Sequence, residues 1–137
     1  MRVKFTIPGV PIPKARPRVP KKGHAFTPKK TKDYEALVKD VYNLTVGKYL
    51  GDSAIVATID LYFPIPESYS KSKKRRIAEG EIKHTKRPDV DNCAKAILDA
   101  LNEVAYKDDA QIVESRITKH YAIDDETRAE VVLEEVF

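Results

Sequence analysis

The segment between residues 54 and 63 constrains the fold most, because apolar side chains occupy every second position along it. Side chains on an extended strand point alternately to two faces, so this spacing predicts a strand with one buried face. The positions on that face are Ile55, Ala57, Ile59, Leu61 and Phe63. A strand of this kind must bury its apolar face against a second layer, so we expect a sheet covered by other elements.

The N-terminal part of the chain predicts one more strand and one long helix. Residues 3–7 alternate like a strand, and residues 34–45 place apolar side chains at helical spacing, with Thr31 or Asp33 as the cap. Between them, residues 14–32 carry eight basic side chains and no acidic one. A segment with that charge cannot bury a face, so we expect an exposed basic loop.

The rest of the chain predicts two helices and a β-hairpin. Residues 70–78 are typical of a short basic helix with a serine cap, and an apolar stripe predicts a second helix over residues 91–105. Residues 112–122 and 128–136 alternate as strands, and the acidic turn at residues 124–126 favours a hairpin between them. This order predicts an α/β fold, with helices packed on a mixed β-sheet.

Size and composition indicate a single domain over residues 1–137, because a chain of this length buries enough surface for one core. The longest apolar run is far shorter than the roughly 20 residues of a membrane span, and the N-terminus does not resemble a secretion signal. We therefore expect a cytoplasmic protein with no membrane partner. Cys93 has no second cysteine to pair with, and the three histidines lack the spacing of a zinc site.

The modest net charge of +4 hides a strong asymmetry along the chain. Residues 1–87 carry 20 basic and 8 acidic side chains, a net charge of +12, whereas residues 88–137 carry 5 and 13, a net charge of −8. This division indicates a surface that attracts a polyanion beside a compact acidic site. The alternative is that the two halves neutralise each other in the fold.

The acidic half opens with the most informative motif of the chain, Asp89 and Asp91 followed by Lys95. Pro88 favours extended chain around it, so we expect the two side chains to face the same way, with Cα atoms about 6.6 Å apart, and their carboxylates to share one ion. Lys95 follows Asp91 by one helical turn and is expected over the same site. A simpler interpretation makes the two aspartates helix N-caps.

Such a cluster suits Mg²⁺, which prefers oxygen ligands and is normally held by one or two carboxylates together with substrate phosphate. A bound Mg²⁺ acts as a Lewis acid on a phosphodiester and lowers the pKa of an attacking water. Asp108 and Asp109 bring two more carboxylates after the helix, although a solvated turn also explains them. The cluster predicts a metal-dependent nuclease, in which Lys95 orients the water or offsets charge in the transition state.

The same residues resemble the RusA family of Holliday-junction resolvases, small endodeoxyribonucleases of phages and prophages. The matching positions are Arg87-Pro88-Asp89-Val90-Asp91-Asn92, Lys95, Asp99-Ala100-Leu101 and Asp108-Asp109 with Gln111-Ile112-Val113. The resemblance implies a RusA-like α/β homodimer in the bacterial cytoplasm that nicks four-way DNA junctions symmetrically. It also implies Mg²⁺ as the cofactor, with Mn²⁺ as a substitute, and no small-molecule cofactor.

Residue by residue, the resemblance places Asp89, Asp91 and Asp109 at the family's catalytic, metal-binding positions and Lys95 at its essential lysine. Asp108 is the alternative for the third carboxylate. We expect the basic residues that precede or flank the motif to bind DNA phosphates. These are Lys14, Arg16, Arg18, Lys21, Lys22, Lys73, Lys74, Arg75, Arg76 and Arg87.

Two other functions also fit the sequence. A restriction-type nuclease needs an aspartate followed at a distance by an acidic residue, one spacer and a lysine, and Asp60 with Glu81 and Lys83 fits that template weakly. A non-enzymatic nucleic-acid-binding module requires only the basic face. Substitution of Glu81 tests the first alternative, and metal titration tests the second.

Overall fold

The computed structural model describes residues 1–15, 23 and 28–136, and the statements below concern these residues. Strands and helices follow one another as the sequence predicts, and each strand agrees with its predicted segment to within one residue at either end. In chain order the elements are β1 (Arg2–Pro8), α1 (Lys29–Thr45), β2 (Ala54–Phe63), α2 (Lys71–Ala78), α3 (Val90–Ala100), the 3-10 turn η1 (Asp109–Gln111), β3 (Ile112–Tyr121) and β4 (Arg128–Val136).

The four strands form one mixed sheet in the order β1-β4-β2-β3. Strand β4 pairs antiparallel with both β1 and β2, whereas β2 and β3 run parallel. A parallel pair needs a crossover connection, and the segment containing α2 and α3 supplies it between β2 and β3. The hairpin expected at residues 124–126 is therefore wrong, because β4 inserts between β1 and β2 instead of pairing with β3.

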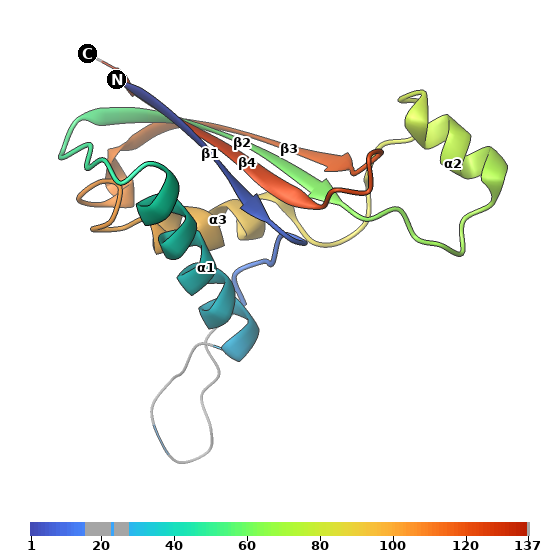
Figure 1. The fold of residues 1–137 in the computed structure, drawn as a ribbon, viewed down its shortest axis with the longest axis horizontal. Helices are drawn as coiled ribbons and strands as arrows, with labels where there is room; N and C mark the ends of the chain where they lie inside the picture. Colours follow the sequence, from blue (N-terminus) through green and yellow to red (C-terminus); the bar gives the residue numbers. More distant parts are fainter. Residues whose placement is uncertain (16–22, 24–27, 137) are drawn as a thin grey trace.

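Helices α1 and α3 cover one face of the sheet, and α2 projects beyond one end of it (Figure 1). The covered face carries the alternate β2 positions predicted from the sequence, from Ile55 to Phe63, and all are buried. They belong to one core with Val38 of α1 and Ile97 of α3. The expected α/β fold with helices on a mixed sheet is confirmed, and burial of these apolar side chains holds the layers together.

Helix α1 begins earlier than expected, at Lys29, so the cap predicted at Thr31 or Asp33 is wrong. Thr31 is fully buried inside the helix. Its hydroxyl accepts a hydrogen bond from the Ala15 amide (3.1 Å) and donates one to the Pro13 carbonyl (3.3 Å). Thr31 therefore fastens the segment that follows β1 against α1, instead of starting the helix.

Helix α3 ends at Ala100, whereas the apolar stripe predicted a helix as far as Ala105. Leu101 caps the helix, and Glu103 has a left-handed backbone (φ 64°) through which a helix cannot continue. The stripe continues because Ala105 and Tyr106 in the following turn are fully buried. Burial in this turn happens to follow helical spacing, which is why the sequence predicted a longer helix.

Helix α2 begins after Ser70 as predicted, because the Ser70 hydroxyl accepts a hydrogen bond from the Lys73 amide (3.2 Å). Only Ile77 of this helix is buried, so most of its surface faces solvent. Among the described residues, none of the helices has the length and apolar character needed to cross a membrane.

Candidate active site

The site begins where the chain enters α3. Asp89 occupies the N-cap position with an extended backbone (φ −71°, ψ 145°), and its side chain makes no capping hydrogen bond. Because α3 already starts at Val90, Asp91 lies in the first helical turn. The expectation that Asp89 and Asp91 lie together on extended chain is therefore wrong. Asp89 thus has extended backbone and Asp91 helical backbone.

Both carboxylates remain close to the buried thiol of Cys93. Burial raises the pKa of Cys93 to about 11, the positive charge of Lys119 opposes this shift, and the negative charges of Asp89 and Asp91 add to it. The thiol is fully buried and stays protonated at neutral pH. Cys93 is thus a packed core residue with no chemical part in the site.

Four charged side chains line one hollow of about 310 Å³ between α3, η1 and β3, which we call the carboxylate hollow. They are Asp91, Lys95, Asp99 and Asp109. Its apolar walls include Leu98 of α3 and the β3 side chains Ile112 and Ile117. Asp89, the N-cap residue of α3, is not part of this lining. The structure thus brings together three of the four predicted catalytic residues and adds Asp99.

Asp99 links the charged groups of the carboxylate hollow. Its Oδ2 lies 3.6 Å from the ammonium of Lys95 and 3.4 Å from that of Lys14. Lys14 is also paired with Glu35 of α1 at 3.0 Å. The sequence analysis matched Asp99 to the family motif without giving it a role. The available signal was the spacing of Asp91, Lys95 and Asp99, which places all three on one face of a helix.

The two neighbouring aspartates after α3 have different surroundings. The Asp108 carboxylate caps η1 by accepting a hydrogen bond from the Ala110 amide (3.1 Å), and the Gln111 side chain accepts one from the Asp108 amide (2.8 Å). The Asp109 amide donates to Oδ1 of Asn102 (2.8 Å), and the Asp109 carboxylate lines the carboxylate hollow. This geometry favours Asp109 over Asp108 as the third carboxylate.

The surroundings of Asp109 raise the pKa of its carboxyl above the usual value. Burial is the largest cause. A hydrogen bond from the protonated Asp109 carboxyl to Asp99 and the negative charges of Asp99 and Asp108 add to the shift. The positive charge of Lys95 works in the opposite direction. Asp99 and Asp109 are therefore close enough for one to sense the charge of the other, as expected of carboxylates that lack a cation between them.

A divalent metal ion is compatible with these residues. No three histidine, cysteine, aspartate or glutamate side chains of the described chain come close enough together to hold an ion by themselves. Mg²⁺ does not require three, because it normally keeps several waters and takes one or two carboxylates together with substrate phosphate. Asp91, Asp99 and Asp109 bring three carboxylates to one lining, where a cation would offset their negative charge. The donor set of the carboxylate hollow therefore fits Mg²⁺.

Lys119 of β3 fixes the segment that enters α3. Its ammonium donates hydrogen bonds to the carbonyls of Lys86 (2.6 Å) and Pro88 (3.1 Å). Pro88 directly precedes Asp89, so Lys119 positions the chain on which that carboxylate stands. No sequence signal marked Lys119, because its partners are main-chain atoms 33 and 31 residues away along the chain.

The predicted DNA-binding residues fall into several groups. Arg16, Arg18, Lys21 and Lys22 lie outside the described residues. Lys14 is half-buried and its ammonium faces Glu35 and Asp99, so its place is beside the carboxylates and not on an open surface. Residues 29–32 of the expected basic loop belong to α1.

Helix α2 carries the other predicted basic residues. Arg75 and Arg76 are exposed, and Arg76 pairs with Glu81 at 3.1 Å. Lys73 places its ammonium 3.7 Å from the centre of the Tyr69 ring, and Lys74 is half-buried. Arg87, between α2 and α3, is exposed.

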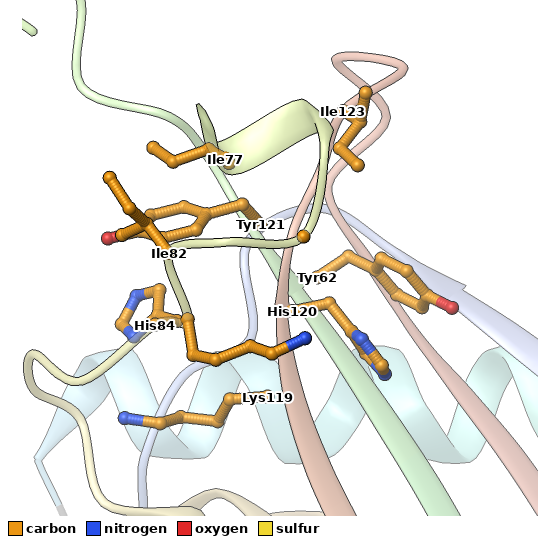
Figure 2. A pocket seen from close by; sticks show the side chains of 10 residues that line it. Tyr62, Ile77, Ile82, His84, Lys119, His120, Tyr121 and Ile123 are labelled. Carbon is orange, nitrogen blue, oxygen red and sulfur yellow. The ribbon is translucent and has the colours of Figure 1, made fainter. Parts of the chain in front are cut away.

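The residues of the restriction-type alternative have other partners. Oδ1 of Asp60 and Nε2 of His120 are hydrogen-bonded at 2.8 Å, and Asp60 points to the face of the sheet opposite that of the buried Ile59 and Leu61. Glu81 pairs with Arg76 after α2. Lys83 lines a separate hollow together with His120. In Figure 2, Tyr62 and His120 stack on one side of β3, whereas the Lys119 side chain leaves on the opposite side. The residues of this template therefore lie outside the carboxylate hollow.

Carboxylates and a lysine that line one hollow are typical of enzymes that hydrolyse phosphodiesters with a metal ion. The family model described as "Endodeoxyribonuclease RusA" matches residues 8–134. The chain belongs to the RusA endodeoxyribonuclease family, as the motif around Asp89 and Asp91 predicted.

A relative from Bacillus subtilis (strain 168), with the name "Uncharacterized protein YqaN", is 35% identical over 139 residues. The alignment covers 98% of this chain and 96% of the relative. The similarity therefore extends over both proteins and is not confined to the motif.

Proposed function

We propose that this protein is a Mg²⁺-dependent, structure-specific endodeoxyribonuclease that resolves four-way DNA junctions by symmetric nicking as a homodimer. The observation that carries the proposal is the carboxylate hollow, where Asp91, Asp109 and Lys95 share one lining with Asp99. Family membership supplies the class of reaction, endonucleolytic cleavage of DNA. The branched substrate follows from the family likeness of the motif.

Asp91 and Asp109, which line the hollow, are the residues that would hold Mg²⁺, together with Asp89 at the N-cap of α3. The bound ion supplies Lewis-acid stabilisation of a phosphate oxygen and an activated water. Asp99 stays close to Asp109 and holds the Lys95 ammonium at 3.6 Å. Lys95 is largely exposed, which lets it reach a phosphodiester laid across the hollow and offset negative charge in the transition state.

Binding of the DNA requires cations around the hollow, because phosphate contacts supply most of the affinity for nucleic acid. The exposed side chains of Arg75 and Arg76 on α2, and of Arg87 beside the motif, are the candidates for these contacts. Symmetric nicking of a four-way junction needs two equivalent sites on opposite strands. A homodimer with twofold symmetry provides them from one type of chain.

The test is cleavage of a synthetic four-way junction with Mg²⁺ by the unmodified protein and by Asp91→Asn. The expected result is paired nicks by the unmodified protein, and loss of cleavage with retained junction binding in the variant. Asp125→Asn is the matched control, because Asp125 is exposed in the turn before β4 and its removal changes the net charge equally. Full activity of Asp91→Asn, or equal loss in Asp125→Asn, would refute the assignment.

Two further measurements separate the alternatives. A binding module without enzymatic activity would bind the junction but show no Mn²⁺ affinity that depends on Asp89, Asp91 or Asp109, which calorimetric titration measures. A restriction-type nuclease would lose cleavage in Glu81→Gln. The proposed site predicts near-normal cleavage by that variant, because Glu81 pairs with Arg76 on α2.

A further inference from the structure

A second hollow, of about 460 Å³, lies immediately before the motif, and we call it the aromatic hollow. It is formed where the end of β2, the start of the α2 connection and the segment entering α3 meet. Its lining includes Phe63, Tyr69, His84, Arg87, Pro88 and Tyr121. Its volume falls within the range of ligand pockets, about 300 to 1,000 Å³.

Flat rings dominate this lining. The His84 ring stands between Phe63 and Tyr121, with 4.8 Å between ring centres on either side. Figure 2 shows His84 and Tyr121 on the same side of β3 as Lys119. Tyr69 lies against Tyr121, and it adds to the rise in the pKa of Tyr121 that burial causes. A hollow walled by rings and prolines suits a flat, apolar, aromatic ligand.

His84 contributes its ring, and not a hydrogen bond, to this wall. Its Nδ1 is buried, so a molecule in the hollow does not reach that atom. The match of the lining to a ligand therefore rests on its rings and on the charges at its rim.

The rim of the aromatic hollow is basic. Lys86 and Arg87 form part of it and are exposed. Lys73 covers the Tyr69 ring at 3.7 Å and is not part of the lining, so it approaches the ring from outside the hollow. A ligand that joins an aromatic ring to a negative charge matches this arrangement. A nucleotide of single-stranded DNA has that composition.

We propose that the aromatic hollow receives an unpaired base of the DNA substrate, with its face against Tyr69 and its phosphate between Arg87 and the carboxylate hollow. This inference rests on the proposed function. All bases of a four-way junction are paired, but the pairs at its crossover can lose a stacked neighbour, so a base opens there at lower cost than within a duplex. Pro88 lines the hollow and Asp89 follows it, so a base held here leaves its own phosphate beside the metal-binding residues. The hollow then helps to choose which phosphodiester is cut.

The first test measures binding of a four-way junction and of a short oligodeoxythymidylate by Tyr69→Ala and Tyr69→Phe. Loss of one base–aromatic stack should weaken both complexes about 5- to 150-fold in Tyr69→Ala. Tyr69→Phe keeps the ring and should bind within about twofold of the unmodified protein. Tyr49→Ala is the control, because Tyr49 is an exposed tyrosine outside the lining of the aromatic hollow, in the connection between α1 and β2.

The second test needs no variant of the hollow and so is independent of folding defects. Photocrosslinking of a junction with 5-iodouracil at the crossover should modify Tyr69, His84 or Tyr121, as mapped by mass spectrometry. Unchanged binding by Tyr69→Ala, or crosslinks confined to other residues, would overturn the inference. If the junction is neither bound nor cleaved, the proposed function fails, and crosslinking of the oligodeoxythymidylate alone then decides for or against the base site.

Discussion

Replacement of Lys119 by methionine tests whether the hydrogen bonds from its ammonium to residues 86 and 88 are needed for catalysis. Methionine keeps an unbranched, apolar side chain of similar reach but cannot donate the two hydrogen bonds to the Lys86 and Pro88 carbonyls (2.6 and 3.1 Å). A hydrogen bond to a charged group contributes about 1.5 to 3 kcal/mol. The bond to Lys86 is exposed, so water replaces much of it, and we count only the half-buried bond to Pro88.

A loss of about 1.5 to 3 kcal/mol in holding Asp89 in place corresponds to a fall of about 10- to 150-fold in kcat/KM for junction cleavage. The Mn²⁺ affinity of Lys119→Met is a second test. Removal of a positive charge beside Asp89 would by itself tighten cation binding. Displacement of the Asp89 carboxylate would weaken cation binding. We expect weaker Mn²⁺ binding in Lys119→Met, measured by calorimetric titration.

The matched control is Arg116→Met on the same strand. Arg116 is 70% exposed and pairs only with its neighbour Glu114, so its replacement removes the same charge without releasing the segment before α3. We expect its cleavage rate to stay within about twofold of that of the unmodified protein. If the two variants cleave junctions equally well, or if Lys119→Met binds Mn²⁺ more tightly, the positioning role of Lys119 is refuted.

Three other predictions concern the support of the site. Tyr106→Phe removes a 2.6 Å hydrogen bond to a carbonyl at the end of α3, so thermal unfolding should shift down by roughly 3 to 10 °C, for about 1 to 3 kcal/mol; an unchanged Tm would contradict this. Asp99→Asn should lower the pKa of Asp109, seen by carboxylate NMR titration of the metal-free protein, whereas an unchanged or higher pKa would contradict the geometry. A carboxyl group whose pKa is raised by folding makes the free energy of unfolding decrease as the pH rises through that pKa. The decrease caused by Asp109 should therefore be smaller in Asp99→Asn. Ser70→Ala should destabilise the start of α2 by about 0.5 to 2 kcal/mol, and hydrogen exchange at the Lys73 amide should quicken; equal exchange rates would show that the cap is unimportant.

The strands were predictable because each has a local, period-two pattern, but their order was not. The turn at residues 124–126 looks like a hairpin turn, and Asp125 does take a left-handed backbone there (φ 61°). A turn reverses the chain without specifying which strand becomes the neighbour. In this sheet β2 provides the pairing edge for both β3 and β4, so the two strands joined by the turn are separated by β2.

The candidate site was predictable in part for a similar reason. Asp91 and Lys95 stand one helical turn apart, so their proximity is a local property of α3. The starting residue of the helix was predicted one position late, and that difference places Asp89 and Asp91 on different types of backbone. Lys14 reaches Asp99 across the layers from a segment 85 residues earlier, and no spacing rule predicts such a contact.

The position of β4 also bears on how the protein is made. This strand follows the other three in sequence and yet lies between β1 and β2, and β1 pairs with β4 alone among the described strands. During synthesis on the ribosome, residues 2–8 therefore have no strand partner until residues 128–136 have been made. Such long-range closure is slow compared with helix formation, and it leaves the first strand exposed to other chains in the meantime. The sheet that α1 and α3 pack against is completed only after residues 128–136 have left the ribosome.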